Sequence, residues 1–277
     1  ANFENRYQQL VPEHCLVLLG PQYALLQSKY SHLHPRTPPR KGKVKRVLIF
    51  FGGADQHNLA RRTIAAFIKL KRNDIKIDVV VNSNSPEATE IEAQVKSYSN
   101  IEVHSDLPSL ATLILKADLA IGSSGATSWE RCCLGLPSLV ITLAENQRSI
   151  ANELHERGLV IWLGHYDAVT DDKLLGSLKN VIDGEELLSW SRACMSVTDG
   201  KGARRVASAL SLNGATSLRA RLARVSDEGF LRLLANLVLV YESGANQDDF
   251  AVEIFQNWFF GRLRDPERCK IYIVETE

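Results

Sequence analysis

Short apolar segments alternate with helical patterns along the chain up to about residue 212, and this alternation constrains the fold more than any other feature. The apolar segments are typical of buried strands, and the segments between them carry apolar residues at helical spacing. Strands that alternate with helices indicate a parallel sheet with both faces covered. We therefore predict an α/β fold with a Rossmann-like parallel sheet. The predicted strands are 47–51, 77–81, 101–104, 119–122, 138–143 and 159–163.

Helical patterns lie between these strands and after the last one. After the first strand, for example, Leu59, Ile64, Phe67 and Ile68 recur at helical spacing. The predicted helices are 59–70, 86–98, 108–116, one that follows residues 123–127 and ends at Gly135, one that follows a polar loop at 144–147, 171–182, 185–196 and 202–212.

The loop that follows the strand at 119–122 consists of small residues, Ser123, Ser124, Gly125, Ala126 and Thr127. In parallel sheets ligands bind outside the carboxyl ends of the strands, which is where this loop lies. Small residues let the backbone approach a phosphate, and the N–H groups of a helix N-terminus favour an anion. The same residues would also form a tight turn with a Ser or Thr helix cap, so this loop alone leaves both interpretations open.

A second glycine loop, Gly52-Gly53-Ala54-Asp55, follows the strand at 47–51. Strand, paired glycines and helix together are typical of a turn that approaches phosphate. The loop does not match the dinucleotide motif GxGxxG, and it lacks the Lys-Ser/Thr of a P-loop. Asp55 could also simply cap the helix that follows. Two glycine loops at one sheet edge favour a phosphate-containing ligand over a purely structural turn.

Composition excludes several classes of protein. Of the 277 residues 45% are hydrophobic and 23% charged, with a net charge of +1, so we expect a globular protein that binds no nucleic acid. Five cysteines form no CxxC pair, which indicates reduced thiols and a cytoplasmic protein. No apolar run approaches the roughly 18 residues of a membrane span, and no signal peptide opens the chain. His and carboxylate residues show no metal-ligand spacing, so no metal site is expected.

Two segments outside the alternating pattern call for separate interpretations. The basic run at 32–46 (HLHPRTPPRKGKVKR) could be a phosphate-binding patch, but we favour a solvated linker. After Asn213 the pattern changes to a strand-like piece at 218–222, helices at 227–240 and 254–263 separated by a polar loop at 243–249, and a lone strand at 270–274. We interpret this region as a second domain cut short, since a lone strand leaves its edges unpaired.

With both glycine loops identified, residues 1–212 resemble a known family. They are similar to the carboxyl-terminal lobe of the UDP-sugar hydrolases of pseudaminic acid biosynthesis, which release UDP from UDP-2,4-diacetamido-2,4,6-trideoxy-β-L-altropyranose. That family is related to GT-B glycosyltransferases such as the enzyme that forms lipid II. The matching pieces are LLGPQYALL (18–26), FFGGAD (50–55), ADLAIGSSGATSWE (117–130), GLPSLVI (135–141), ENQ (145–147) and VTDGKGARRVASAL (197–210).

The resemblance implies roles for individual residues. It places the UDP diphosphate near Gly52, Gly53 and the loop 123–127. It makes Glu130 the acceptor of hydrogen bonds from the ribose hydroxyls, and it places Asn146 and Gln147 beside the sugar and the bond that breaks. Neutral backbone donors suit a diphosphate and a carboxylate suits a diol. The predicted nucleotide-binding residues are Gly52, Gly53, Asp55, Ser123, Ser124, Gly125, Ala126, Thr127, Glu130 and Gln147, with Asn146 as the substrate-side catalytic residue.

The chain departs from the family in one respect. The family's general base is a histidine in a glycine-rich loop of the other lobe, and no GxGHxxR motif occurs in this sequence. Among the histidines present, His57 is closest to a glycine loop, but a surface or capping role fits it better. We therefore expect 1–43 to be the connection between lobes, 44–213 to bind a UDP-sugar, and catalysis to need the missing amino-terminal lobe of the same protein.

Residues 216–277 resemble the beginning of a GNAT-type acetyltransferase, through LRARLARVSDEGFLRLLAN, FQNWFFGRL and RDPERCKIYIVE. The resemblance implies acetyl-CoA as the cofactor of that domain when it is complete, whereas sugar hydrolysis needs none. An ordinary helical appendage is the alternative.

Three functions stay open at this point: a nucleotide-sugar hydrolase of nonulosonic acid or surface polysaccharide biosynthesis, a GT-B glycosyltransferase that uses the same UDP lobe, and a UDP-sugar-binding module without activity. The sequence fixes neither the sugar nor the oligomeric state.

Overall fold

The computed structural model describes residues 15–53, 55, 57–212, 218–229, 231 and 272–276. The chain divides into two compact units, 1–205 and 206–277. None of the helices in the described residues is long and apolar enough to cross a membrane.

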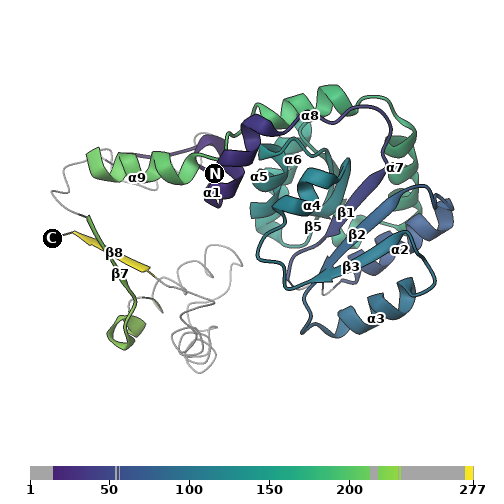
Figure 1. The fold of residues 1–277 in the computed structure, drawn as a ribbon, viewed down its shortest axis with the longest axis horizontal. Coiled ribbons are helices and arrows are strands. Elements are labelled where there is room, and N and C mark those ends of the chain that lie inside the picture. Colours follow the sequence, from purple (N-terminus) through teal and green to yellow (C-terminus); the bar gives the residue numbers. More distant parts are fainter. Residues whose placement is uncertain are drawn as a thin grey trace. The chain divides into compact units, whose positions relative to one another are not determined.

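The first unit contains a six-stranded parallel sheet with strand order β3-β2-β1-β4-β5-β6 (Figure 1). The strands are β1 (Arg46–Phe50), β2 (Lys76–Val81), β3 (Ile101–Ser105), β4 (Leu119–Ser123), β5 (Ser138–Thr142) and β6 (Ile161–His165). The order reverses between β1 and β4, so the loops that follow these two strands diverge at a topological switch point. The predicted α/β fold with a Rossmann-like sheet is confirmed.

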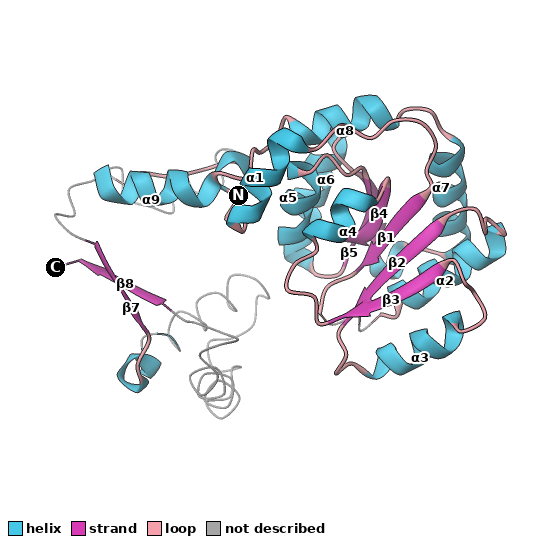
Figure 2. Cartoon of the chain, in the orientation of Figure 1, coloured by secondary structure: helices cyan, strands magenta, loops and turns pink. Residues whose placement is uncertain are grey.

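Nine α-helices occur within the described residues, and Figure 2 shows α2 to α8 beside the sheet of the first unit. They are α1 (Ser28–Leu33), α2 (Leu59–Leu70), α3 (Pro86–Val95), α4 (Ala111–Lys116), α5 (Ala126–Cys133), α6 (Glu145–Glu156), α7 (Asp171–Asp183), α8 (Leu187–Met195) and α9 (Gly202–Leu212). Several predicted boundaries differ from the observed ones; α3, for example, ends at Val95 and α4 begins at Ala111. Strand β6 begins at Ile161 because Leu159 and Val160 still donate to the carbonyl of Leu154 after α6. Helix α6 begins at Glu145, so Asn146 and Gln147 lie in its first turn and not in a loop.

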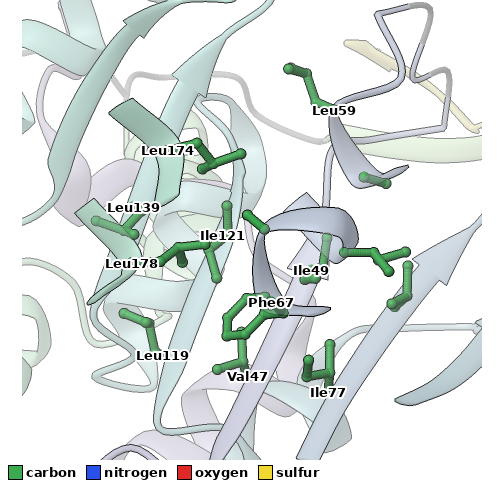
Figure 3. Packing of buried hydrophobic residues seen from close by; sticks show 14 of the residues in the cluster. Val47, Ile49, Leu59, Phe67, Ile77, Leu119, Ile121, Leu139, Leu174 and Leu178 are labelled. Carbon is green, nitrogen blue, oxygen red and sulfur yellow. The ribbon is translucent and has the colours of Figure 1, made fainter. Parts of the chain in front are cut away.

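Alternation along the strands sends side chains into two separate cores. On one face Val47, Ile49 and Ile121 pack with Phe67 of α2 and with α7, as Figure 3 shows. On the other face Leu48 packs in a cluster that includes residues of α1, α4, α5 and α6. Successive strand residues point to opposite faces, so both faces of every central strand are apolar. This burial accounts for the continuous apolar runs in the sequence.

The basic segment at 32–46 is solvated only in part: His32, Lys41 and Lys43 are exposed, but other residues of the segment are buried. Arg40 is buried, and its guanidinium donates to the carbonyls of Ile114, Ala117 (3.1 Å from Nε) and Leu134. These carbonyls lie at the ends of α4 and α5, where helices leave acceptors without an intrahelical donor. Tyr30 is also fully buried. Part of the expected connection 1–43 therefore belongs to the core of the first unit.

The second unit contains two described strands, β7 (Leu218–Leu222) and β8 (Tyr272–Thr276), which pair antiparallel. The expectation of a lone, unpaired strand near 270–274 is wrong, because β8 pairs with β7 along its whole length. The predicted helix at 254–263 and the loop at 243–249 lie outside the described residues, as does most of the predicted helix at 227–240. A short 3-10 turn, η4 (Val225–Asp227), follows β7.

Candidate functional site

The loop between β4 and α5 is shaped by hydrogen bonds within its own turn. The backbone N–H of Ser128 donates to the carbonyl of Gly125 (2.9 Å), and the N–H of Gly125 donates to the Ser128 hydroxyl (3.3 Å). The cap is thus closed by Ser128, one turn inside the helix. The hydroxyl groups of Ser123, Ser124 and Thr127 take no part in this cap, which the prediction of a Ser or Thr cap did not anticipate.

Two buried polar atoms at this sheet edge have no hydrogen-bond partner among the described residues. They are the hydroxyl oxygen of Ser124, a fully buried residue, and the Oδ1 atom of Asn146 in the first turn of α6. Ser124 lies in the loop after β4 and Asn146 in the helix that follows β5, and these two strands are neighbours in the sheet. An unpaired buried polar group costs free energy, so such atoms mark a place where a ligand or water completes the bonding.

The loop after β1 presents open backbone. Gly52 has φ +102°, which only glycine adopts without strain, and a Cβ on Gly52 or Gly53 would meet no atom within 4 Å. Asn82 at the end of β2 donates its side-chain N–H to the carbonyl of Gly53 (3.2 Å). The glycines therefore leave space beside the loop while a neighbouring strand fixes it.

Asp55 and Gln147 have their side chains engaged in local structure. The carboxylate of Asp55 accepts from the N–H groups of Leu59 (3.0 Å) and Ala60 (2.7 Å), so the capping alternative describes Asp55. Gln147 accepts from the N–H of Leu143 (2.9 Å) through Oε1. Both side chains therefore have a structural role. The sequence alone could not distinguish this role from ligand binding.

A cavity of about 380 Å³ opens at the carboxyl ends of β1 and β2. Of the predicted residues, Gly53, Thr127 and Glu130 line it, whereas Gly52, Asp55, Ser123, Ser124, Gly125, Ala126, Asn146 and Gln147 do not. Its volume lies within the usual range for small-molecule sites. Apolar residues of the lining include Phe50, Val80 and Leu107, and polar ones include Asn82, Thr127 and Glu130, with Gln27, Asp106 and Ser109.

Sequence reasoning missed Gln27 and the loop Asp106 to Leu110. The loop follows the predicted strand at 101–104, so the rule that ligands bind at carboxyl strand ends could have identified it. Gln27 donates to the carbonyl of Pro108 (3.4 Å) across 81 positions of sequence, and no local signal announces such a contact.

Glu130 is the carboxylate of this cavity. Burial raises its pKa above the ordinary value, while Tyr30, Arg131 and Lys29 oppose that shift. Tyr30 lies beneath it, with its hydroxyl 3.5 Å from Ser109 Oγ. A carboxylate in a half-buried wall is a strong acceptor for two hydroxyl groups of a ligand.

His57 stacks on Tyr166, with ring centroids 3.5 Å apart and planes 7° from parallel. The contact joins the loop after β1 to the 3-10 turn η3 (Tyr166–Ala168) after β6. The stacking gives His57 a packing contact, in place of the capping role that was expected as one alternative.

Asp78, Glu102 and His104 bring three possible metal ligands together within 4.8 Å, although the sequence shows no ligand spacing. The register of β2 and β3 pairs Asp78 with Glu102 and so creates this group. Both oxygens of Asp78 accept from Arg46 (2.5 and 2.8 Å), and Oδ1 is also 2.8 Å from Nε2 of His104. With its oxygens engaged by a cation, Asp78 forms a structural ion pair and is a poor metal ligand.

Residues 47–201, more than half of the chain, match the model of the glycosyltransferase family 28 C-terminal domain. The chain belongs to this family. The matched range contains the sheet, both glycine loops and Glu130, but it ends before the second unit.

Individual relatives of this family 28 domain have different names. The Bacillus subtilis spore coat polysaccharide biosynthesis protein SpsG is 25% identical over 69% of this chain and 57% of its own. The Campylobacter jejuni UDP-2,4-diacetamido-2,4,6-trideoxy-β-L-altropyranose hydrolase is 26% identical over 55% of this chain and 53% of its own. The chain thus spans little more than half the length of these curated relatives.

Among solved structures, Acinetobacter baumannii MurG matches 73% of this chain and 58% of its own with a TM-score of 0.54 and 15% identity. At this identity the likeness concerns the fold alone. It agrees with the predicted lobe of a GT-B glycosyltransferase-like fold.

Proposed function

We propose that this family 28 domain binds a UDP-sugar by its nucleoside diphosphate. The base occupies the cavity against Leu107 and Pro108, Glu130 accepts from the ribose hydroxyls, and the diphosphate lies at the N-terminus of α5. The observation that carries the proposal is the buried, unpaired hydroxyl of Ser124 at that N-terminus. Helix N-termini favour anions, and a phosphate oxygen would complete the bonding of Ser124.

The reaction that fits best is hydrolysis of the UDP-sugar in nonulosonic acid or surface polysaccharide biosynthesis. Its support is the resemblance of the motifs, the Campylobacter relative named a hydrolase and the Bacillus relative named for polysaccharide biosynthesis. In this proposal water attacks the anomeric carbon, UDP leaves, and Asn146 contacts the sugar through its unpaired Oδ1. The base that activates water comes from a histidine loop that this sequence does not contain.

A glycosyltransferase is the second candidate, and the family match favours it. Both reactions use the same UDP site, and they differ in whether water or an acceptor hydroxyl attacks the sugar. A UDP-sugar-binding module without activity is the third. For the hydrolase, UDP release from a UDP-linked diacetamido-trideoxy sugar by the protein joined to its amino-terminal lobe should proceed without any acceptor. Release that requires an acceptor would establish the transferase.

Calorimetric titration of the 277-residue chain with UDP, CDP and uridine tests the binding site. The account predicts that UDP binds and that Glu130→Ala weakens it by about 1–3 kcal/mol, the cost of losing hydrogen bonds to a charged group. Glu145→Ala is the matched control, since Glu145 is an exposed carboxylate that pairs with Arg148 on the surface of α6. Equal affinity of the wild type and Glu130→Ala for UDP would contradict the ribose assignment.

The assignment of residues 216–277 to an acetyltransferase-like domain with acetyl-CoA as cofactor stays a prediction, as does the location in the cytoplasm. The family match ends at residue 201. Binding of acetyl-CoA by a longer protein that includes the glycine-rich turn of such a domain would test the first.

A further inference from the structure

Arg131 is a buried cation directly behind the loop that follows β4. Its side chain is 3% exposed, and Nη2 donates to the carbonyl of Ser123 (2.9 Å) and lies 3.1 Å from the Ser128 hydroxyl. Because helical side chains point back toward the N-terminus, the guanidinium lies under the first turn of α5. It therefore lies below the backbone that faces the proposed diphosphate.

Gly122 of β4, which has no side chain, leaves the space that this guanidinium occupies. A Cβ on Gly122 of β4 would lie 2.9 Å from Nη1 of Arg131 and 2.1 Å from the carbonyl oxygen of Phe50. A side chain at this position would collide with both. The remaining space beside Arg131 is too small for a water molecule. Its lining includes Phe50, Ile121 and Thr127. The cation is thus enclosed in a dry site.

Arg131 is also incompletely bonded. Its Nε is buried without a hydrogen-bond partner, and no carboxylate among the described residues lies within ion-pair distance of its guanidinium. Burial lowers its pKa to about 10, so the group remains charged at neutral pH. The adjacent N-terminus of α5 carries positive partial charge as well. Two positive features therefore meet at one place, and the neighbouring groups that offset the charge of Arg131 are the thiols of Cys132 and Cys194 and the carboxylate of Glu130.

We propose that Arg131 is a positioning residue that sets the preference of this site for a diphosphate over an uncharged nucleoside. It acts through the peptide group between Ser123 and Ser124. By donating to the Ser123 carbonyl it polarises the N–H of Ser124 toward the ligand, and its charge adds to the field at the loop. This inference rests on the proposed function and assigns the charge recognition to a residue that does not touch the ligand.

The affinity ratio of UDP to uridine, measured on the full chain by calorimetry and NMR titration, tests the proposal. Arg131→Met should lower UDP affinity about tenfold to a hundredfold, because a buried charge contact is lost, and change uridine affinity less than about threefold. Arg131→Lys keeps the charge and should keep the ratio within about threefold of the wild type.

Arg40→Met is the matched control. Arg40 is also buried, with a pKa also lowered to about 10 by burial, but each of its three guanidinium nitrogens donates to a helix-end carbonyl away from the loop. It should lower the melting temperature and leave the ratio unchanged.

An unchanged ratio in Arg131→Met would overturn the inference. If that variant does not fold, a ratio lowered tenfold or more in Arg131→Lys would overturn it equally, since charge would then not be the determinant. A wild-type chain that binds neither UDP nor uridine would instead refute the proposed function, and the inference with it.

Discussion

Two polar clusters of the same sheet differ in how completely they are bonded. Asp78 on β2 is 1% exposed, and its oxygens accept three hydrogen bonds from Arg46 and His104. At the ends of β4 and β5, by contrast, Ser124, Asn146 and Arg131 each keep a buried polar atom without a partner in the described part of the chain. Both carboxylate oxygens of Asp78 are hydrogen-bonded within the first cluster, whereas each residue of the second cluster keeps an unbonded buried atom.

This difference separates stability from binding. A complete buried network contributes to the fold and to its uniqueness, but an incomplete one costs free energy. An incomplete cluster is tolerated where a ligand completes it, and these three residues lie in the loop and helices that directly follow β4 and β5. The ion pair on β2 and β3 should therefore control stability, and the loops after β4 and β5 should control ligand affinity.

The largest expected effect is on stability, at Asp78. Asp78→Ala leaves Arg46 and His104 without their partner and should lower the free energy of unfolding by about 3 kcal/mol. Urea denaturation measures this loss, and UDP affinity of the folded variant should stay at the wild-type value. Glu102→Ala, which removes a largely exposed carboxylate next to the same cluster, should change stability by less than about 0.5 kcal/mol. A loss of UDP affinity in Asp78→Ala without a loss of stability would contradict the assignment of this ion pair to stability alone.

The same ion pair predicts a pH dependence. Burial alone would raise the pKa of Asp78, but hydrogen bonds from Arg46 and His104 hold it below the ordinary 3.8. A depressed carboxyl pKa stabilises the fold above the unfolded value and loses that contribution as pH falls through the folded value. The stability difference between wild type and Asp78→Asn should therefore be present above about pH 4 and shrink below it. A difference that grows on acidification would contradict this assignment.

A smaller and opposite pair of effects is expected for two buried serines. Ser138 donates to the carbonyl of Leu136 (3.0 Å), whereas Ser124 has no partner. Ser138→Ala should therefore destabilise the protein by about 1 kcal/mol, and Ser124→Ala should be neutral or stabilising by up to about 1 kcal/mol. Thermal unfolding of both variants measures the contrast.

For UDP affinity the ranking is reversed: the substitution of Ser124 should have the larger effect and that of Ser138 the smaller one. Ser124→Ala should weaken UDP binding roughly threefold to tenfold, since one hydrogen bond to a charged oxygen is lost. Ser138→Ala should leave UDP binding unchanged. If Ser124→Ala lost stability but kept UDP affinity, the role of Ser124 would be structural, like that of Asp78, and not ligand binding.

The sequence predicted the sheet and both loops because these depend on local patterns. Six apolar runs and their helical partners were correctly placed, since burial on both faces leaves a continuous apolar run in each strand. The loop 123–127 could be identified from small residues ahead of a helix, whereas Glu130 was assigned through the family resemblance. The role of Arg40 could not, because a buried arginine and a solvated one look the same in a basic run, and only the distant carbonyls of α4 and α5 distinguish them.

The site was only partly predictable for the same reason. Gln27 reaches the cavity from a segment that precedes the sheet, and the partners of Asp78 depend on the register of β2 and β3. Asp55 could be either a cap or a ligand contact by sequence, and the geometry around Leu59 and Ala60 was needed to show the cap. Contacts that join distant segments carry no local signal.

Amide hydrogen exchange of the chain with and without saturating UDP tests the central claim most directly. The account predicts slower exchange at residues 106–110 and 123–130, where the cavity and the N-terminus of α5 meet, and unchanged exchange at β3 and around Asp78. UDP binding with protection confined to other segments, or with none at residues 123–130, would contradict the assignment of this sheet edge as the nucleotide site.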